Sequence, residues 1–214
     1  MIVTGEVERY LHELIPAPDP VLAEMREHGA RDRIPIVDAT TGRLLELLAR
    51  ATGARRIVEV GTAIGVSTLH LLRGCAPDGT VTSFEVDPER HAAARSYLEQ
   101  AGVGGRADLR LQDAGKGLEG LAGPYDLAFL DGLKEDYARH LELVLGLLRP
   151  GGLVAVDNVL MSGDAATGVS NSHWTDDQLA RIRAFNQALV DRHGLVATVL
   201  PVGDGVALAT IGAQ

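Results

Sequence analysis

The chain has 214 residues, of which 46% are hydrophobic, and its formal net charge is −9. This length and composition predict one well-buried domain over residues 1–214, with no linker between two domains. The acidic balance provides no overall basic field, so it argues against nucleic acid as a partner, although a local basic patch is not excluded.

Cys75 is the only cysteine, which excludes an internal disulfide and fits a reducing compartment. We expect it to act as a small apolar residue at the end of a helix. Residues 1–13 lack an apolar core of signal-peptide length, and no segment reaches the roughly 18 apolar residues of a membrane span. The sequence therefore predicts a cytoplasmic protein with no membrane attachment.

Two helices are predicted before residue 55, at residues 21–28 and 41–51. Leucines at positions 44, 45, 47 and 48 form an apolar stripe on the second helix. Residues 1–54 are therefore predicted to form a helical cap. Its helices either close the substrate site, build a dimer face or simply cover a sheet, and the sequence leaves these alternatives open.

From residue 55 onward, apolar runs alternate with amphipathic segments. Strands are predicted at residues 56–60, 80–86, 108–111, 125–130 and 152–156. The helices predicted between and after them lie at residues 67–73, 88–101, 115–121 and 135–148. This alternation implies right-handed crossovers and a mainly parallel, doubly wound α/β sheet in residues 55–214.

The C-terminal connections follow a different pattern. A polar stretch precedes a helix predicted at residues 176–193, with Thr175 as its N-cap. Strands predicted at residues 196–201 and 206–211 flank a glycine-containing turn that is too short for a parallel crossover, so they must form an antiparallel hairpin. A seven-stranded, mostly parallel sheet with a terminal antiparallel hairpin is typical of the Rossmann-like class I methyltransferases, whereas nicotinamide dehydrogenases usually keep six parallel strands.

Two acidic clusters follow neighbouring predicted strands. Asp131 comes directly after one apolar run, and Asp157 with Asn158 comes after the next. Ligands of an open α/β sheet bind outside the carboxyl ends of its strands, so these side chains are expected to meet. Three hard oxygen donors suit Mg²⁺ or a similar divalent cation.

A glycine-containing loop joins the first strand to the next helix. Gly61 and Gly65 allow a sharp turn close to a ligand, and the amides that start the following helix favour an anionic group. Ala63 stands where a dinucleotide fingerprint has its second glycine, which disfavours NAD and favours a ligand that carries a carboxylate. Glu85, at the end of the second strand, is placed to hold ribose hydroxyls.

Together these motifs resemble the cation-dependent O-methyltransferase family, which includes catechol and caffeoyl-coenzyme A O-methyltransferases. The resemblance covers roughly residues 35–212 and rests on the glycine loop combined with Asp131, Lys134 and the segments 149–152 and 157–159. It implies S-adenosylmethionine as the cofactor. The residues that it places around this cofactor are Val37, Glu59, Gly61, Thr62, Ser67, Glu85, Asp113, Ala114 and Asp131.

The same resemblance implies a reaction. Asp131, Asp157 and Asn158 match the family's ligands for Mg²⁺ or another divalent cation such as Mn²⁺ or Ca²⁺, whose open positions would accept two vicinal oxygens. Lys134 matches the family's proposed general base. The implied substrate is a small catechol-like aromatic diol, and the implied assembly is a homodimer.

Other functions remain open at this point. The family also contains enzymes that methylate a hydroxylated tRNA base, and the acidic charge argues against this partner. A non-catalytic protein that binds S-adenosylmethionine would not need the three metal-ligand residues. His173 and Trp174 either line the substrate pocket or pack the polar loop, because an indole ring suits both roles.

Overall fold

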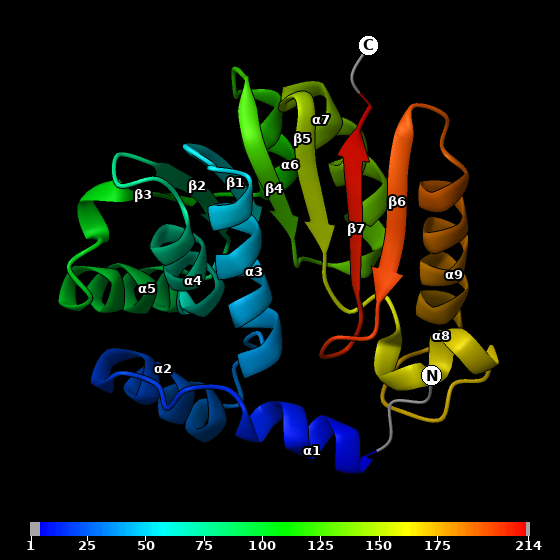
Figure 1. Ribbon diagram of the computed structural model, residues 1–214, viewed down its shortest axis with the longest axis horizontal. Helices are drawn as coiled ribbons and strands as arrows, with labels where there is room; N and C mark the ends of the chain where they lie inside the picture. The colour runs from blue at the N-terminus through cyan, green and yellow to red at the C-terminus, as the bar shows by residue number, and fades with distance from the viewer. Residues whose placement is uncertain (1–4, 213–214) are drawn as a thin grey trace.

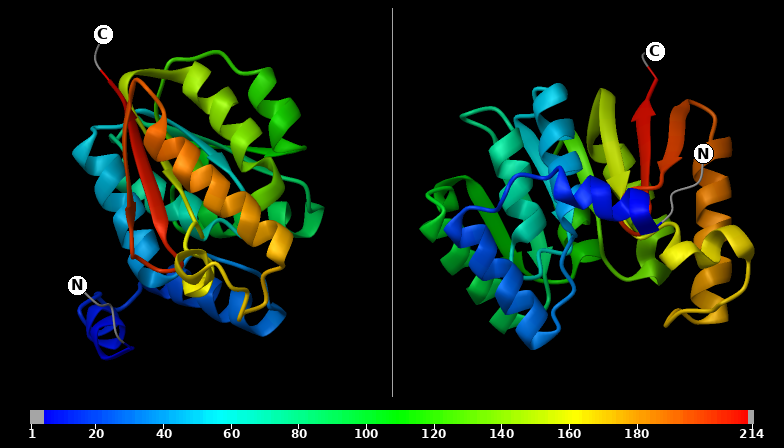
Figure 2. Two further views of the ribbon diagram at one scale, coloured as in Figure 1. Left: turned by 90° about the vertical axis from the view of Figure 1, so that its right-hand side faces the viewer. Right: turned by 60° about the horizontal axis from the view of Figure 1, so that its bottom comes forward.

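The computed structural model describes residues 5–212 and contains a seven-stranded sheet with helices on both faces (Figures 1 and 2). The strand order is β3-β2-β1-β4-β5-β7-β6. Strands β1 to β5 pair in parallel, whereas β7 runs antiparallel to both β5 and β6. The predicted doubly wound sheet with a terminal antiparallel hairpin is therefore confirmed.

The elements follow one another along the chain as the alternating sequence pattern predicts. The strands are β1 (Arg56–Val60), β2 (Thr80–Glu85), β3 (Ala107–Leu111), β4 (Tyr125–Leu130), β5 (Leu148–Val156), β6 (Leu195–Leu200) and β7 (Val206–Ile211). The α-helices are α1 (Gly5–Glu13), α2 (Pro20–Asp32), α3 (Ala39–Ala51), α4 (Val66–Gly74), α5 (Pro88–Gln100), α6 (Ala114–Glu119), α7 (Tyr137–Leu147), α8 (Asp164–Thr167) and α9 (Asp176–Asp191). Short 3₁₀ helices are η1 (Gly104–Arg106), η2 (Lys134–Asp136) and η3 (Met161–Gly163).

Two helices were not expected from the sequence. The first, α1, carries an apolar stripe of Val7, Tyr10 and Leu11 at helical spacing, but none of its residues is buried against the core. The second, α8, has only four residues and lies in the stretch predicted to be a polar loop. Strand β5 also begins earlier than predicted, because Leu148 pairs with Tyr125 ahead of a register shift.

Predictions about helix ends are confirmed. The hydroxyl of Thr175 accepts the backbone N–H of Gln178, whose side chain accepts the backbone N–H of Thr175, so α9 starts with a capping box. Cys75 is the C-cap residue of α4 and is buried. Its thiol therefore lies in the protein interior, as expected for a small apolar residue.

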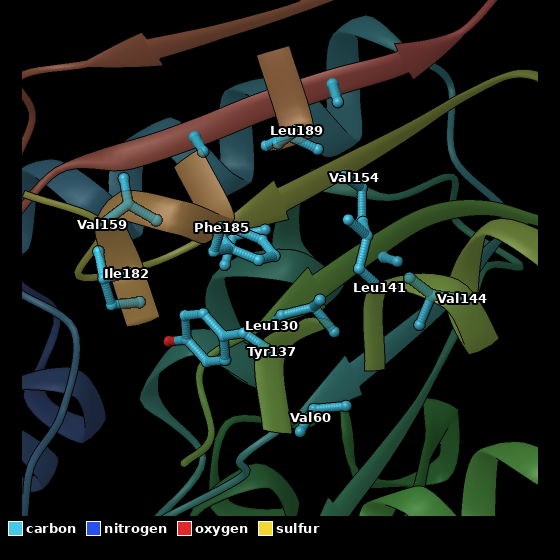
Figure 3. Packing of buried hydrophobic residues seen from close by; sticks show 14 of the residues in the cluster. Val60, Leu130, Tyr137, Leu141, Val144, Val154, Val159, Ile182, Phe185 and Leu189 are labelled. Atoms are coloured by element: carbon cyan, nitrogen blue, oxygen red, sulfur yellow. The ribbon is translucent and has the colours of Figure 1, made fainter. Parts of the chain in front are cut away.

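Each face of the sheet has its own hydrophobic core. One core packs α6, α7 and α9 against the sheet and includes Val60, Leu130 and Phe185 (Figure 3). The other packs α2 to α5 against the opposite face and includes Leu45 and Phe129. Successive residues of β4 point into different cores, so both faces of the strand are apolar. Its sequence therefore does not alternate between apolar and polar residues, which is typical of a buried parallel strand.

The parallel strands β1, β4 and β5 end at one edge of the sheet, and helices α1 and α2 lie at that end of the molecule (Figures 1 and 2). Among the described residues, no helix is long and apolar enough to cross a membrane.

Candidate functional site

The loops that follow β1 and β4 meet at the carboxyl edge of the sheet. Gly61 has a φ of +95°, and a Cβ atom at this position would lie 2.2 Å from the backbone oxygen of Asp131. The amide of Asp131 donates to Val60 O at 2.9 Å, and that of Asp157 donates to Leu130 O at 3.0 Å. The parallel pairing therefore brings the glycine loop and both acidic clusters to one place, and only glycine fits at position 61.

Lys134 lies at the centre of this place, in η2 directly after β4. Its side chain is only 7% exposed. Its Nζ donates to Tyr137 Oη at 2.6 Å, to Asn158 Oδ1 at 2.7 Å and to Gly132 O at 3.2 Å, and it lies 3.6 Å from Asp131 Oδ1. Oxygen atoms from two strand ends thus converge on one cationic group.

Burial controls the protonation of this cluster. It lowers the pKa of Lys134, although the charges of Asp131 and Asp157 oppose the change. Asp157 is 4% exposed, and burial followed by the charge of Asp131 raises the pKa of its carboxyl group. Two adjacent carboxylates that are costly to ionise gain stability from a shared cation, so the donor set fits a divalent metal.

The third candidate ligand follows directly. Asn158 has a φ of +57°, and its backbone N–H donates to Asp157 Oδ1 at 2.8 Å. Residues 5–212 contain no group of three or more His, Cys, Asp or Glu side chains that could hold a metal ion. The candidate set consists instead of two aspartates and the amide oxygen of Asn158.

Tyr137 links the lysine to the Asp157–Asn158 turn. Its ring packs in the core, edge-on to Phe185 with 5.6 Å between ring centroids, and its hydroxyl lies at the edge of the cluster (Figure 3). The hydroxyl accepts from Lys134 Nζ and donates to Asp157 O at 2.9 Å. Burial raises the pKa of Tyr137 well above its ordinary value, so the phenol stays protonated. The sequence pattern predicts that Tyr137 lies on a helix near the site, with packing as its default role.

Glu59 anchors a second polar network below the glycine loop. It is 0% exposed, and its Oε2 accepts from Thr68 Oγ1 and from Ser83 Oγ at 2.6 Å. Ser83 Oγ in turn lies 2.6 Å from Thr62 Oγ1. The other oxygen, Oε1, has no hydrogen-bond partner among the described residues. Sequence reasoning missed Ser83 and Thr68, and the available signal was a hydroxyl inside each buried apolar run.

The carboxyl group of Glu59 makes stability depend on pH. Burial raises its pKa from 4.5 to about 7, so ionisation costs the folded state more than the unfolded state. We expect the unfolding free energy of the wild type to fall, relative to Glu59→Gln, by about 3 kcal/mol as pH rises from about 4.5 to about 7. Urea unfolding over this range tests the prediction. Glu99→Gln, at an exposed position, is the control and should parallel the wild type.

Glu85 organises the glycine loop from the end of β2. Its Oε2 accepts the N–H of Ala63 at 2.8 Å, and its Oε1 accepts the N–H groups of Val86 and Asp87, each at 2.9 Å. Ala63 has a φ of +45°, which the Glu85 contact helps to hold. Oε2, which accepts a single N–H group, keeps a further lone pair for a ligand hydroxyl.

The remaining candidate cofactor residues surround these groups at the same edge. Ser67 lies in the first turn of α4, close enough to Glu59 to affect the pKa of its carboxyl group. Val37 is buried just ahead of α3. Asp113 accepts the backbone N–H of Lys116 as the exposed N-cap of α6, and Ala114 follows it. Asp113 and Ala114 make no contact with the lysine cluster, because they follow β3, two strands away from β1.

Trp174 lies on the other side of Lys134. Nζ of Lys134 is 5.8 Å from the centroid of the indole ring. The exposed ring of His173 lies next to the indole, with 4.4 Å between the two ring centroids. The indole N–H is buried and has no hydrogen-bond partner within residues 5–212. The structure thus places the indole of Trp174 beside the candidate site, with His173 behind it.

Comparison with known proteins agrees with this fold and site. A family model described as O-methyltransferase matches residues 14–211. The catechol O-methyltransferase of Mycobacterium tuberculosis is 35% identical over 214 residues, covering 96% of this chain and 95% of the relative. An O-methyltransferase from Bacillus cereus, solved in complex with SAH, is 29% identical with a TM-score of 0.84, covering 96% of this chain and 97% of that one.

A further related structure contains SAM as its bound ligand. An O-methyltransferase from Streptomyces achromogenes, solved with SAM, is 31% identical with a TM-score of 0.82 and covers 97% of this chain and 96% of its own. These bound structures support S-adenosylmethionine as the cofactor, and they confirm the family resemblance drawn from the strand-end motifs. The chain belongs to the O-methyltransferase family.

Proposed function

We propose that this protein is a divalent-cation-dependent enzyme that transfers the methyl group of S-adenosylmethionine to one hydroxyl of a small catechol-like diol. The observation that carries the proposal is the convergence of Asp131, Asn158 and the buried Lys134 beside the glycine loop at Gly61. Such a cluster offers oxygen ligands for a cation, an amine that can act as a base, and a glycine loop that lets the backbone come close to a cofactor. All three lie at the carboxyl ends of the same parallel strands.

We assign the amino-acid end of the cofactor to the glycine loop. The unbonded, fully buried Oε1 of Glu59 is an acceptor suited to the cofactor's ammonium group. Ser67, at the start of α4, is suited to its carboxylate, because free amides and the helix dipole favour an anion there. Gly61, Thr62 and Asp131 complete this end.

The rest of the cofactor is assigned along the same edge of the sheet. Glu85 would bind the ribose hydroxyls, and Asp113 with Ala114 would border the adenine. Val37 would pack against the cofactor from the N-terminal side. This order follows the strand order from β1 through β2 to β3, which sets the direction in which an extended ligand lies.

Asp131, Asp157 and Asn158 would hold the divalent cation. When bound, the cation would lower the pKa of the substrate hydroxyl, and the cofactor would supply an electrophilic methyl group. As the neutral amine, Lys134 would hold a lone pair at Nζ that accepts the proton of the substrate hydroxyl. Burial favours the neutral amine that this proton transfer needs.

Tyr137 positions this base, so its hydroxyl should matter for rate more than for binding. We expect Tyr137→Phe to lower kcat by about 10-fold and to leave the affinity for S-adenosylmethionine unchanged, because the ring keeps its packing while one hydrogen bond to a charged group is lost. Steady-state kinetics and calorimetry measure the two quantities.

Tyr97 offers a matched control. It is also buried, and its hydroxyl lies 3.0 Å from Nδ1 of His28, a residue that is not assigned to the cofactor, the cation or the base. Tyr97→Phe should cost similar stability and leave kcat intact. An equal fall of kcat in both variants would assign the effect of Tyr137 to general packing.

Incubation with labelled S-adenosylmethionine, Mg²⁺ and a panel of dihydroxy aromatics tests the proposed function directly. We expect transfer to at least one vicinal diol, none to the matching monohydroxy compounds, and loss of transfer when a chelator is added. Transfer that persists in the chelator would refute the cation dependence, and failure with every diol would refute the substrate class.

The N-terminal helices are assigned to the cap of this site. Helices α1 and α2 lie at the end of the molecule where β4 and β5 end (Figure 1), whereas α3 packs in the core on one face of the sheet. We propose that residues 1–54 cap a single domain formed by the whole chain. The homodimer and the cytoplasmic location stay predictions.

A further inference from the structure

A second cavity lies apart from the candidate methyl-transfer site. Its volume is about 360 Å³, and it is bordered by α1, α2, α3, α4 and the connection between α1 and α2. None of the residues assigned above to the cofactor, the cation or the base lines it. Its size falls within the range of about 300 to 1,000 Å³ that is common for small-molecule sites.

The charged lining of this cavity is partly neutralised. Arg73 pairs with Asp19 at 2.6 Å, and Arg43 pairs with Glu46 at 3.0 Å. These two ion pairs leave Arg26 as a further arginine of the lining, with no further carboxylate among the described residues of the lining to balance its charge. The cavity is therefore locally basic in a protein whose net charge is −9.

Arg26 is the basic group without a partner. Its side chain is half-buried in α2, yet within residues 5–212 its guanidinium makes no hydrogen bond and has no carboxylate within 4 Å. Burial lowers its pKa, and Asp38 acts on it only through its charge. Partial burial of a guanidinium group whose five N–H donors have no protein acceptor costs free energy. An oxyanion can accept two of these N–H groups at once, because its oxygen atoms match their planar arrangement.

His70 lines the same cavity from α4. Its side chain is 3% exposed, its Nδ1 lies 3.4 Å from Glu46 Oε2, and its Nε2 is buried without a hydrogen-bond partner among the described residues. Burial lowers the pKa of His70 to about 4, and the charge of Arg26 adds to this effect. His70 is therefore uncharged at neutral pH, which leaves the guanidinium of Arg26 as the group in this cavity that would bind an anion.

We infer that this cavity binds a small organic anion, a carboxylate or a phosphate ester with an apolar body, and that Arg26 is its main contact. The apolar part of the lining, which includes Ile15, Pro16 and Leu22, suits the body of such a ligand. Carboxylate and phosphate share the two-oxygen edge that a guanidinium recognises, so the choice between them is left to measurement.

Calorimetric titration with benzoate, phenyl phosphate and inorganic phosphate, in the presence of saturating S-adenosylhomocysteine, tests the inference. We expect one-to-one binding of at least one organic probe and an affinity about 10-fold to 100-fold lower in Arg26→Gln, because a charge-assisted contact is lost. Arg33→Gln is the control. It removes the same charge from the exposed C-cap of α2 and should change the affinity less than about twofold.

Thermal unfolding gives a second measurement. At one probe concentration, the Tm of the wild type should rise more than that of Arg26→Gln, since a ligand stabilises the folded state according to its affinity for that state. Arg26→Lys, which keeps the charge and loses the fork, should bind with intermediate affinity. No saturable binding of any probe, equal loss in Arg33→Gln, or displacement by S-adenosylhomocysteine would each overturn the inference.

Discussion

Asp157→Ala is expected to reduce methyl transfer by about 10³-fold or more, because several kcal/mol of transition-state stabilisation depend on the cation that its carboxylate would hold. The affinity for S-adenosylmethionine should change little, since no assigned cofactor contact involves this side chain. Transfer of labelled methyl groups measures the first quantity, and calorimetry with the cofactor and with Mn²⁺ measures the second and the loss of metal binding.

The unfolding free energy of Asp157→Ala distinguishes a loss of the cation site from a loss of the folded structure. Burial raises the pKa of Asp157, so the carboxylate destabilises the folded protein at neutral pH and its removal should not lower the unfolding free energy at pH 8. Asp177→Ala, which removes an exposed carboxylate from α9, is the control and should keep wild-type activity. If Asp157→Ala retained more than about a tenth of the wild-type rate, the cation site would have to lie elsewhere.

Lys134→Met should lower kcat by about 10² to 10⁴-fold, the range expected when a positioned general base is removed. The side chain keeps a similar length, so binding of S-adenosylmethionine should be unaffected. The residual rate should keep rising with pH, because the substrate hydroxyl must then ionise without a protein base. Initial rates between pH 6 and about 10 test both statements.

The control for Lys134 is the exposed Lys116 of α6. Lys116→Met removes the same charge from a surface position and should leave the rate and its pH profile intact. If both variants lost activity equally, or if Lys134→Met kept the pH profile of the wild type, the lysine would act through its charge or packing and would not accept the proton.

The order of the helices and strands could be predicted from the amino-acid sequence alone. Alternation of apolar runs with amphipathic segments identified all seven strands, and the short turn at residues 203–205 required the antiparallel hairpin. Because parallel strands share a carboxyl edge, the positions of Asp131 and Asp157 along the chain also predicted that they would meet. These inferences depend on local periodicity and on the few topologies that a doubly wound sheet allows.

The hydrogen bonds between polar side chains, in contrast, become visible only once the chain is folded. Glu59 and Ser83 stand on neighbouring strands 24 residues apart, and the link from Lys134 through Tyr137 to Asp157 joins η2, α7 and the end of β5. The unpartnered Arg26 is equally invisible in the sequence. Side-chain hydrogen bonds and burial depend on rotamers and on the packing of distant segments, and periodicity carries no information about either.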